Sequence, residues 1–274
     1  MPSIRPDNLP DFQRPPIYEV AIGVQFEPTP QYQQILAHEI WALYRADFPH
    51  VEYQRALPPS FETFGRPQST SINIDLAGGA THDRFWFLSP DKQELIQFQP
   101  DRLLHNWRKV EGVQSEYPRF EKMIEKFTTE IGLLADYFKK LGQQEFVINQ
   151  CEITYINHIP LDGSVDSTGA VANRTFKVID LSALEVESLN FQMNEQFKNP
   201  DGKLFGRLHC KIQSAYQRGA SDRILVLELT VRGAPETGSI ASAISFLEMG
   251  RSKVVQTFAK ITTEEAHKIW GRVQ

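Results

Sequence analysis

The sequence first limits the problem by what it lacks. No stretch approaches the roughly 18 uncharged apolar residues that a membrane-spanning helix needs. The N-terminal MPSIRPDNLPDFQRPP has no apolar centre of the kind found in secretion signals. The net charge of −5 argues against nucleic-acid binding through overall charge, although a local basic face would still be competent. We therefore expect a cytoplasmic protein without a membrane partner.

Cysteines and catalytic motifs are also scarce. The two cysteines, Cys151 and Cys210, lie inside predicted strands without CxxC or histidine spacing around them, which favours reduced, buried thiols over a disulfide or metal site. Seven histidines are scattered and none forms HExxH. GxSxG, the Walker loop and GxGxxG after a strand are all missing. The sequence therefore predicts no metal and no cofactor.

The longest helical pattern follows residue 116. Apolar residues spaced by three and four predict one buried helix face over 117–141. Pro118 is suited to the first helical turn, where the N–H that proline lacks would have no acceptor within the helix. Gly142 is a typical residue at which a helix ends. A helix with one apolar face must cover a sheet. Its stripe comprises Tyr117, Phe120, Ile124, Phe127, Ile131, Leu134, Phe138 and Leu141.

The other elements occur in an order that repeats. The first half has a strand at 17–26, a helix to about 47, strands near 51–55, 72–76, 85–88, 94–98 and 102–108, and the long helix. The second half has a strand at 146–156, an ambiguous stretch at 175–186, a meander of strands at 189–197, 203–217 and 224–232, and a long helix over 240–261. Thr262 and Glu265 predict a capping box for a last helix.

This order predicts an α+β fold of antiparallel sheets, each covered by a long helix. We divide the chain into an extended arm (1–16), a first half (17–142) and a second half (143–274). The halves could together form one saddle-like or helix-grip-like sheet with both helices on one face. The alternative is a single irregular α+β domain without a repeat.

Several segments resemble a sporadically distributed bacterial family of uncharacterised proteins. They are RPPIYEVAIGVQFEP, Asp47-Phe48-Pro49, HNWRKVEGVQSEYPRFE, TYINHI and TTEEAHKIWGRV, and together they span nearly the whole chain. The resemblance implies a link to mobile-element or defence genes but no reaction. Members of the family carry a polar pair such as His-Asp on the last long helix. Here Gly250-Arg251-Ser252 stands in the corresponding place, which departs from that pattern.

A basic strip is the first candidate site. Alternation over 203–217 places six residues on one strand face, which is open if the helices cover the other: Lys203, Phe205, Arg207, His209, Lys211 and Gln213. Such a face could contact phosphates, with the phenylalanine ring available for stacking. The competing interpretation is a solvated strand whose charges are balanced by neighbouring glutamates.

Two further candidates contain arginine. His105 and Trp107 should point to one sheet face and Asn106 and Arg108 to the other, which predicts a Trp-centred core; the alternative is a pocket lined by Trp107 and Arg108. Arg251 lies on the apolar stripe of the last long helix. It requires a carboxylate or carbonyl partner there, or else binds an anion or another protein.

The function that these features favour is a non-enzymatic binding or regulatory module that engages a macromolecular partner, protein or nucleic acid, through an open sheet face. The alternative is an enzyme or small-ligand binder with a cavity between sheet and helices, for which Glu152, His209 and Glu228 are the polar groups to test. A homo-oligomeric scaffold is the third interpretation.

Overall fold

A single antiparallel sheet organises the chain. A computed structural model describes residues 6–64, 84–114, 116–143, 145–161, 167–217 and 222–274. Its nine strands follow the order β2-β3-β4-β5-β1-β6-β9-β8-β7. The strands are β1 (Ile17–Phe26), β2 (His50–Gln54), β3 (Arg84–Leu88), β4 (Glu94–Gln99), β5 (Arg102–Arg108), β6 (Ile148–Pro160), β7 (Asn190–Lys198), β8 (Leu204–Tyr216) and β9 (Arg223–Gly233).

The first strands of the two halves pair at the centre of this sheet. β1 contacts β6 on one edge and β5 on the other, so the two halves share one layer of strands. On one side the order β1-β5-β4-β3-β2 runs outward, and on the other the order is β6-β9-β8-β7. Each half thus has a first strand, a meander that returns beside it, and then a long helix. The expected α+β class is confirmed, but separate sheets are not found.

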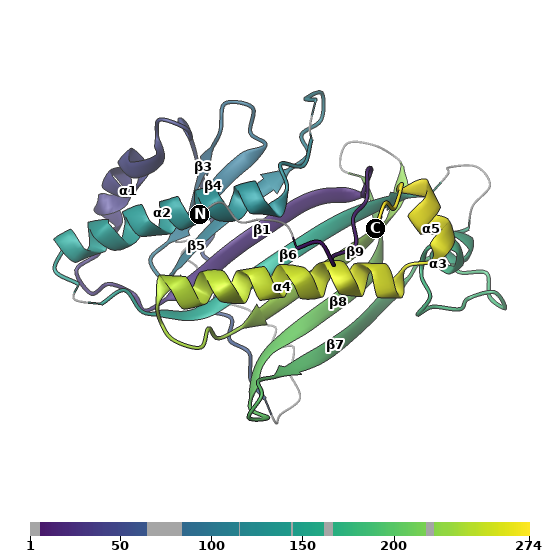
Figure 1. The fold of residues 1–274 in the computed structure, drawn as a ribbon. Helices are drawn as coiled ribbons and strands as arrows, with labels where there is room; N and C mark the ends of the chain where they lie inside the picture. The colour runs from purple at the N-terminus through teal and green to yellow at the C-terminus, as the bar shows by residue number, and fades with distance from the viewer. Residues whose placement is uncertain (1–5, 65–83, 115, 144, 162–166, 218–221) are drawn as a thin grey trace, which may run out of the picture.

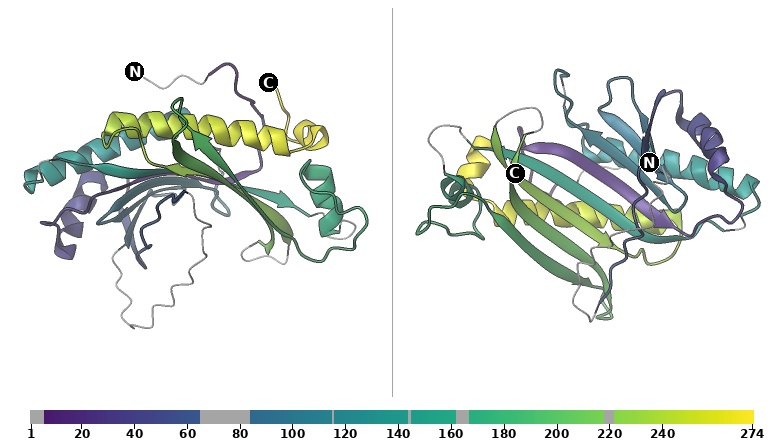
Figure 2. Two further views of the ribbon diagram at one scale, coloured as in Figure 1. Left: turned by 90° about the horizontal axis from the view of Figure 1, so that it is seen from below. Right: turned by 180° about the vertical axis from the view of Figure 1, so that it is seen from behind.

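Both long helices lie on one face of the sheet. α2 (Phe120–Lys140) contacts β1 and β5, α4 (Ile240–Ile261) contacts β6 and β9, and the two helices touch each other. Figure 2 shows them together above the curved sheet, and none of the helices in the described ranges covers the opposite face. Their apolar stripes meet the alternating apolar residues of the strands, such as Val20, Ile22 and Val24 of β1.

Shorter helices close the ends of this layer. α1 (Ala37–Tyr44), preceded by the 3₁₀ turn η1 (Gln34–Leu36), packs against α2 and β3, whereas α3 (Thr168–Thr175) packs against α5 (Glu264–Ile269) at the far end of the sheet (Figure 1). Within the described ranges, no helix is long and apolar enough to span a bilayer. Both cysteines are free and buried, as expected from their strand positions.

The N-terminal arm is anchored to the C-terminal segment. Phe12 forms a β-bridge with Arg272, and the amide of Val273 donates to the carbonyl oxygen of Asp11 at 3.0 Å. Leu9 and the Phe12 ring are buried, the ring edge-on to Phe258. The arm therefore crosses the helix layer near the end of α4.

Several predicted boundaries differ from those observed. α2 starts at Phe120 rather than Tyr117, because Arg119 at its N-cap has φ 72° and breaks the helical path after Pro118. The cap of α5 is Thr263, one residue later than predicted, and its hydroxyl accepts from the amide of Ala266. The ambiguous stretch at 175–186 forms no strand, and α3 lies just before it. The strand predicted at 72–76 lies outside the described residues.

α4 approaches the sheet closely at a glycine. A methyl group placed on Gly250 would lie 2.8 Å from Cγ2 of Ile153 and 3.2 Å from Cγ1 of Val231. Both neighbours are β-branched and stiff, so neither can move away at low cost. Gly132 in α2 has no such neighbours within 4 Å.

These two glycines provide a matched test of helix packing. We expect Gly250→Ala to lower the free energy of unfolding by roughly 1–3 kcal/mol through overpacking, less the gain in helix propensity. Gly132→Ala should raise it by up to about 1 kcal/mol, since only propensity changes. Urea unfolding measures both. Stabilisation of the Gly250 variant as large as that of the Gly132 variant would contradict the close packing of α4.

Candidate functional site: the open face and its strap

The face opposite the helices is lined by polar side chains. Strand register decides which residues share it, because directly paired residues in antiparallel strands point to the same side. Gln25 pairs with Arg102 and Gln150, which places all three on this open face. Along the same face lie Gln99, Gln97, Asn106, Glu19, Glu152, Arg232, Arg207, Thr154, Thr230, His209, Glu228 and Lys211.

A segment without helix or turn crosses this face. We call residues 57–64, which follow β2, the strap. Pro58 and Pro59 fix φ near −65° and restrict the preceding Leu57 to extended conformations, so the sequence itself favours an extended path. Nearly all of the strap's polar contacts described below are made with side chains of the sheet.

Two glutamines bind the strap by its backbone. The Leu57 amide donates to Oε1 of Gln99 at 3.1 Å, while Nε2 of Gln99 donates to the Leu57 carbonyl oxygen at 3.0 Å. Gln25 holds Ser60 in the same way, with distances of 2.9 Å from the Ser60 amide and 2.6 Å to its carbonyl oxygen. Each carboxamide thus pairs with one residue's N–H and C=O, much as a neighbouring strand would.

Arg102 supplies a third backbone contact. Its Nη2 donates to the Pro58 carbonyl oxygen at 3.0 Å and to Oε1 of Gln25 at 2.5 Å. Gln25, Gln99 and Arg102 are 7%, 3% and 9% exposed, so these bonds are largely shielded from water. Loss of one of these hydrogen bonds would be costly, because the polar group left without its partner is buried and could not bind water instead.

The spacing of these contacts requires an extended chain. Gln99 on β4 and Gln25 on β1 are separated by β5, so they lie two strand spacings, roughly 10 Å, apart. Leu57 and Ser60 are three residues apart, and three extended residues also span roughly 10 Å. The strap therefore runs across the strands, and a helical turn would be too short for the same contacts.

Beyond Ser60, the strap places a carboxylate among basic side chains. Glu62, whose side chain is 2% exposed, forms an ion pair with Arg207 and accepts from Nε2 of His209 at 2.6 Å. Nη1 of Arg232 lies 3.7 Å from the same carboxylate. Charge-assisted bonds of this kind are about twice as strong as neutral ones. We call Arg207, His209 and Arg232 the carboxylate clamp.

The clamp has further contacts that fix its geometry. Nη2 of Arg207 donates to the Thr63 carbonyl oxygen at 3.0 Å, and its guanidinium lies 5.2 Å from the centre of the Phe64 ring. Arg232 also pairs with Glu152 on β6. The two arginines are therefore balanced by two carboxylates only while Glu62 is present.

A second polar network orders the open face of the first half. Arg84 and Trp86 both donate to Oε1 of Gln97, at 2.8 and 3.1 Å. The side-chain NH₂ of Gln97 in turn donates to Oδ1 of Asn106 at 2.9 Å. Asn106 in turn donates to Glu19 at 2.6 Å. Burial raises the pKa of the Glu19 carboxyl, an effect opposed by the bond from Asn106. These hydrogen bonds fix the orientation of the Gln97 and Asn106 carboxamides.

The predicted basic strip is not a continuous exposed surface. Arg207 is only 5% exposed and lies beneath the strap, so the prediction that its side chain faces solvent is wrong. Phe205 is turned toward the helix side by a bulge opposite Phe197, where its ring contacts Phe246 of α4. Lys203 precedes β8 in an exposed turn. His209 belongs to the clamp, and Lys211 pairs with Glu228 on the neighbouring strand β9.

The other candidates lie on the opposite side of the sheet or apart from each other. Trp107 is buried on the helix side of the sheet against Tyr117, whereas Arg108 is on the open face, so they do not line one pocket. Nη2 of Arg251 pairs with Glu121 at 2.9 Å, as its position on the stripe predicted. Buried His105 contacts both carboxylate oxygens of Glu130, at 2.9 and 3.0 Å, beneath α2.

The polar groups of the enzyme alternative do not converge. Glu152 pairs with Arg232 and Glu228 lies opposite Ile156, four residues farther along β6 and roughly 13 Å away. His209 contacts Glu62 instead of either of them. In the part of the chain that the structure describes, no group of three or more potential ligands could hold a metal ion.

Sequence reasoning missed the residues that bind the strap. The prolines and glycines around Glu62 predict only a loop, although two adjacent prolines followed by an acidic residue are typical of an extended recognition segment. The alternation of its strand predicts a polar face for Gln25, but nothing in the sequence indicates its partner 35 residues away.

Hydrogen exchange tests the glutamine contacts. Gln25→Met should lower protection of the Ser60 amide by about tenfold or more, because two buried hydrogen bonds of about 1 kcal/mol each are lost. Gln196→Met, on the exposed part of the same face, is the matched control. Unchanged Ser60 protection in the Gln25 variant would mean that the strap is not held there.

Comparisons with known proteins do not assign this arrangement to a family. The chain matches no protein-family model, and no curated protein is similar to it at a significant level. The case for function therefore depends on the contacts of the open face, the strap and the carboxylate clamp.

Proposed function

We propose that the protein is a peptide-binding module whose open sheet face recognises an extended, acidic polypeptide segment. The observation that carries this proposal is the two-point pairing of Gln25 and Gln99 with the backbone of Ser60 and Leu57. The strap is then an intramolecular example of the ligand class, and the partner is a protein segment that occupies the same path.

Backbone pairing supports recognition without a strict sequence requirement. The carboxamides of Gln25 and Gln99 contact N–H and C=O groups that every residue except proline supplies. Their spacing selects an extended segment, and the Arg102 contact needs only a carbonyl oxygen, so proline is accepted between the two pairing residues. Recognition of this kind reuses strand pairing, with amide side chains in place of a strand edge.

The carboxylate clamp supplies the preference for an acidic residue. Among the described residues, a segment that lacked a carboxylate two residues after the Ser60 position would leave Arg207 and Arg232 with only Glu152 as a carboxylate partner. Uncompensated buried charge is strongly unfavourable, so such a segment should be rejected. Glutamate or aspartate at this position is therefore the expected specificity feature.

The distribution of charge favours a protein partner over nucleic acid. Glu19, Glu152 and Glu228 lie among the basic residues of the open face. A nucleic-acid site needs a net positive groove along the phosphate backbone, and these carboxylates would repel it. An isolated carboxylate on a peptide requires only the local clamp.

The strap makes this site self-inhibited. A partner must displace Glu62 and the backbone of Leu57 and Ser60. Its apparent association constant is therefore the intrinsic constant multiplied by the fraction of molecules in which the strap is released. The tether also gives the strap a high effective concentration, typically millimolar for a short connection. Weakening the strap should therefore increase binding of a segment supplied separately.

A peptide with the sequence of residues 56–64, ALPPSFETF, tests the proposal with the chain's own ligand. We expect Glu62→Lys to release the strap by repulsion from the clamp arginines and to bind this peptide with 1:1 stoichiometry. Wild-type protein should bind it at least about tenfold more weakly, which corresponds to about 1.4 kcal/mol of competition. Fluorescence anisotropy of labelled peptide measures both.

Matched controls separate recognition from nonspecific charge effects. Glu111→Lys makes the same charge change at an exposed turn residue after β5, outside the strap and the carboxylate clamp, and should bind like wild type. The peptide with lysine in place of its glutamate should bind the Glu62 variant at least about tenfold more weakly. Failure of a folded Glu62→Lys protein to bind ALPPSFETF would refute the proposed function.

A further inference from the structure

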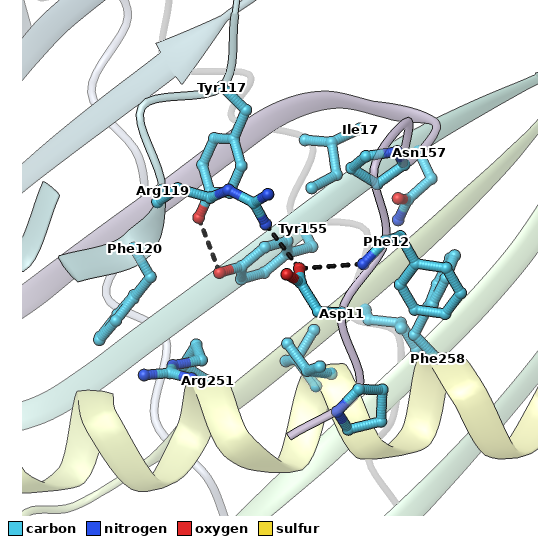
Figure 3. Close-up of a pocket in the computed structure, with 15 residues that line it drawn as sticks. Asp11, Phe12, Ile17, Tyr117, Arg119, Phe120, Tyr155, Asn157, Arg251 and Phe258 are labelled. Carbon is cyan, nitrogen blue, oxygen red and sulfur yellow. Dashed lines mark hydrogen bonds and ion pairs between the residues drawn. The ribbon is translucent and has the colours of Figure 1, made fainter. Parts of the chain in front are cut away.

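A small cleft lies on the helix side of the sheet, away from the strap. It is bounded by the N-terminal arm, the start of α2, the middle of α4 and strand β6, as Figure 3 shows. Its volume is about 60 Å³, enough for about four to six water-sized groups. Most of its walls are apolar, including Phe12, Ile17, Val254 and Phe258.

Arg251 lies at this cleft with unused hydrogen-bond donors. Its side chain is 3% exposed, and its guanidinium lies 4.9 Å from the centre of the Phe120 ring. Nη2 donates to Glu121 at 2.9 Å, but Nε and Nη1 are buried and have no acceptor among the residues that the structure describes. Buried donors are nearly always satisfied in folded proteins, so these two indicate a missing acceptor.

The backbone beside the cleft is strained. Arg119 has φ 72° and ψ 150°, a region that is essentially restricted to glycine. This conformation lies between Tyr117 and Phe120, both of which line the cleft. The Arg119 side chain pairs with Asp11 at 2.7 Å and so connects the start of α2 to the arm (Figure 3). Strain of this kind is concentrated at binding sites, where it positions the side chains on either side.

Local charge indicates what the cleft can hold. Arg251 is balanced by Glu121, and Arg119 by Asp11, so the polar border is already neutral. A carboxylate or phosphate would add an uncompensated negative charge to a mainly apolar site. An uncharged carbonyl group can accept from the free donors of Arg251 without that penalty.

We propose that this cleft binds a small uncharged compound that carries a carbonyl oxygen, of the size of a short-chain amide or ketone. Arg251 donates to the carbonyl oxygen, and the apolar walls contact the carbon chain. The Tyr117 and Tyr155 hydroxyls, 2.9 Å apart, form a polar group at the same cleft. This site is separate from the peptide-binding face and does not depend on it.

Propionamide and propionate are suitable probes because they match in size and differ in charge. In the protein of residues 1–274, propionamide should shift the Arg251 Nε–H resonance saturably in NMR titrations, with millimolar affinity as expected for so small a ligand. Propionate should bind more weakly. No saturable shift with propionamide would show that the cleft holds only water and would overturn the proposal, as would tighter binding of propionate.

Two variants decide whether Arg251 and the cleft are responsible. Arg251→Met should weaken propionamide binding by about tenfold or more, measured on cleft methyl resonances such as that of Ile17. Val255→Phe should fill the cleft and abolish binding while leaving the pair of Arg251 with Glu121 intact, so it serves even if the first variant fails to fold. Arg45→Met, at an exposed site, is the control. Wild-type affinity in Val255→Phe, or in folded Arg251→Met, would contradict the assignment.

Discussion

The pairing of β1 with β6 is the interaction on which the rest of the structure depends. It runs along nearly the whole of β1 and joins two meanders into one sheet. Because each half contributes its long helix to the same side, the main hydrophobic core forms between helices and sheet on that side. The opposite face is left without a helical layer and must satisfy its polar groups in another way.

The strap is the solution to that constraint. Long polar side chains on an open face lose conformational freedom only if they gain fixed partners. Gln25, Gln99 and Arg102 obtain theirs from a segment that crosses the strands, and Arg207 and His209 obtain a carboxylate. The same groups that stabilise this face therefore define the chemistry of a ligand that could replace the strap.

Local patterns predicted much of the fold. Alternation in β1 and the stripe of α2 were sufficient to identify these elements, because burial of one face imposes its period on the sequence. The hairpins that join β7, β8 and β9 followed from turn residues. Errors arose where one residue changes the pattern, as at Arg119 before α2 and at the bulge that turns Phe205 toward α4.

The candidate site was less predictable, because its contacts connect distant residues. Glu62 meets Arg207 across 145 positions, and no periodic signal records such a pair. Alternation correctly placed Arg207 and His209 on the open face but could not show that a loop covers them. The signal that does exist is chemical: two prolines and a glutamate within six residues describe an extended acidic segment.

The most direct test of the account follows the strap itself when a competitor is present. Amide exchange of Leu57 and Ser60 should be measured in wild-type protein with and without saturating ALPPSFETF peptide. The account predicts that both amides are protected in the free protein and lose protection when the peptide binds, while β1 and β6 are unaffected. Peptide binding that leaves strap protection unchanged, or a strap unprotected from the start, would contradict it.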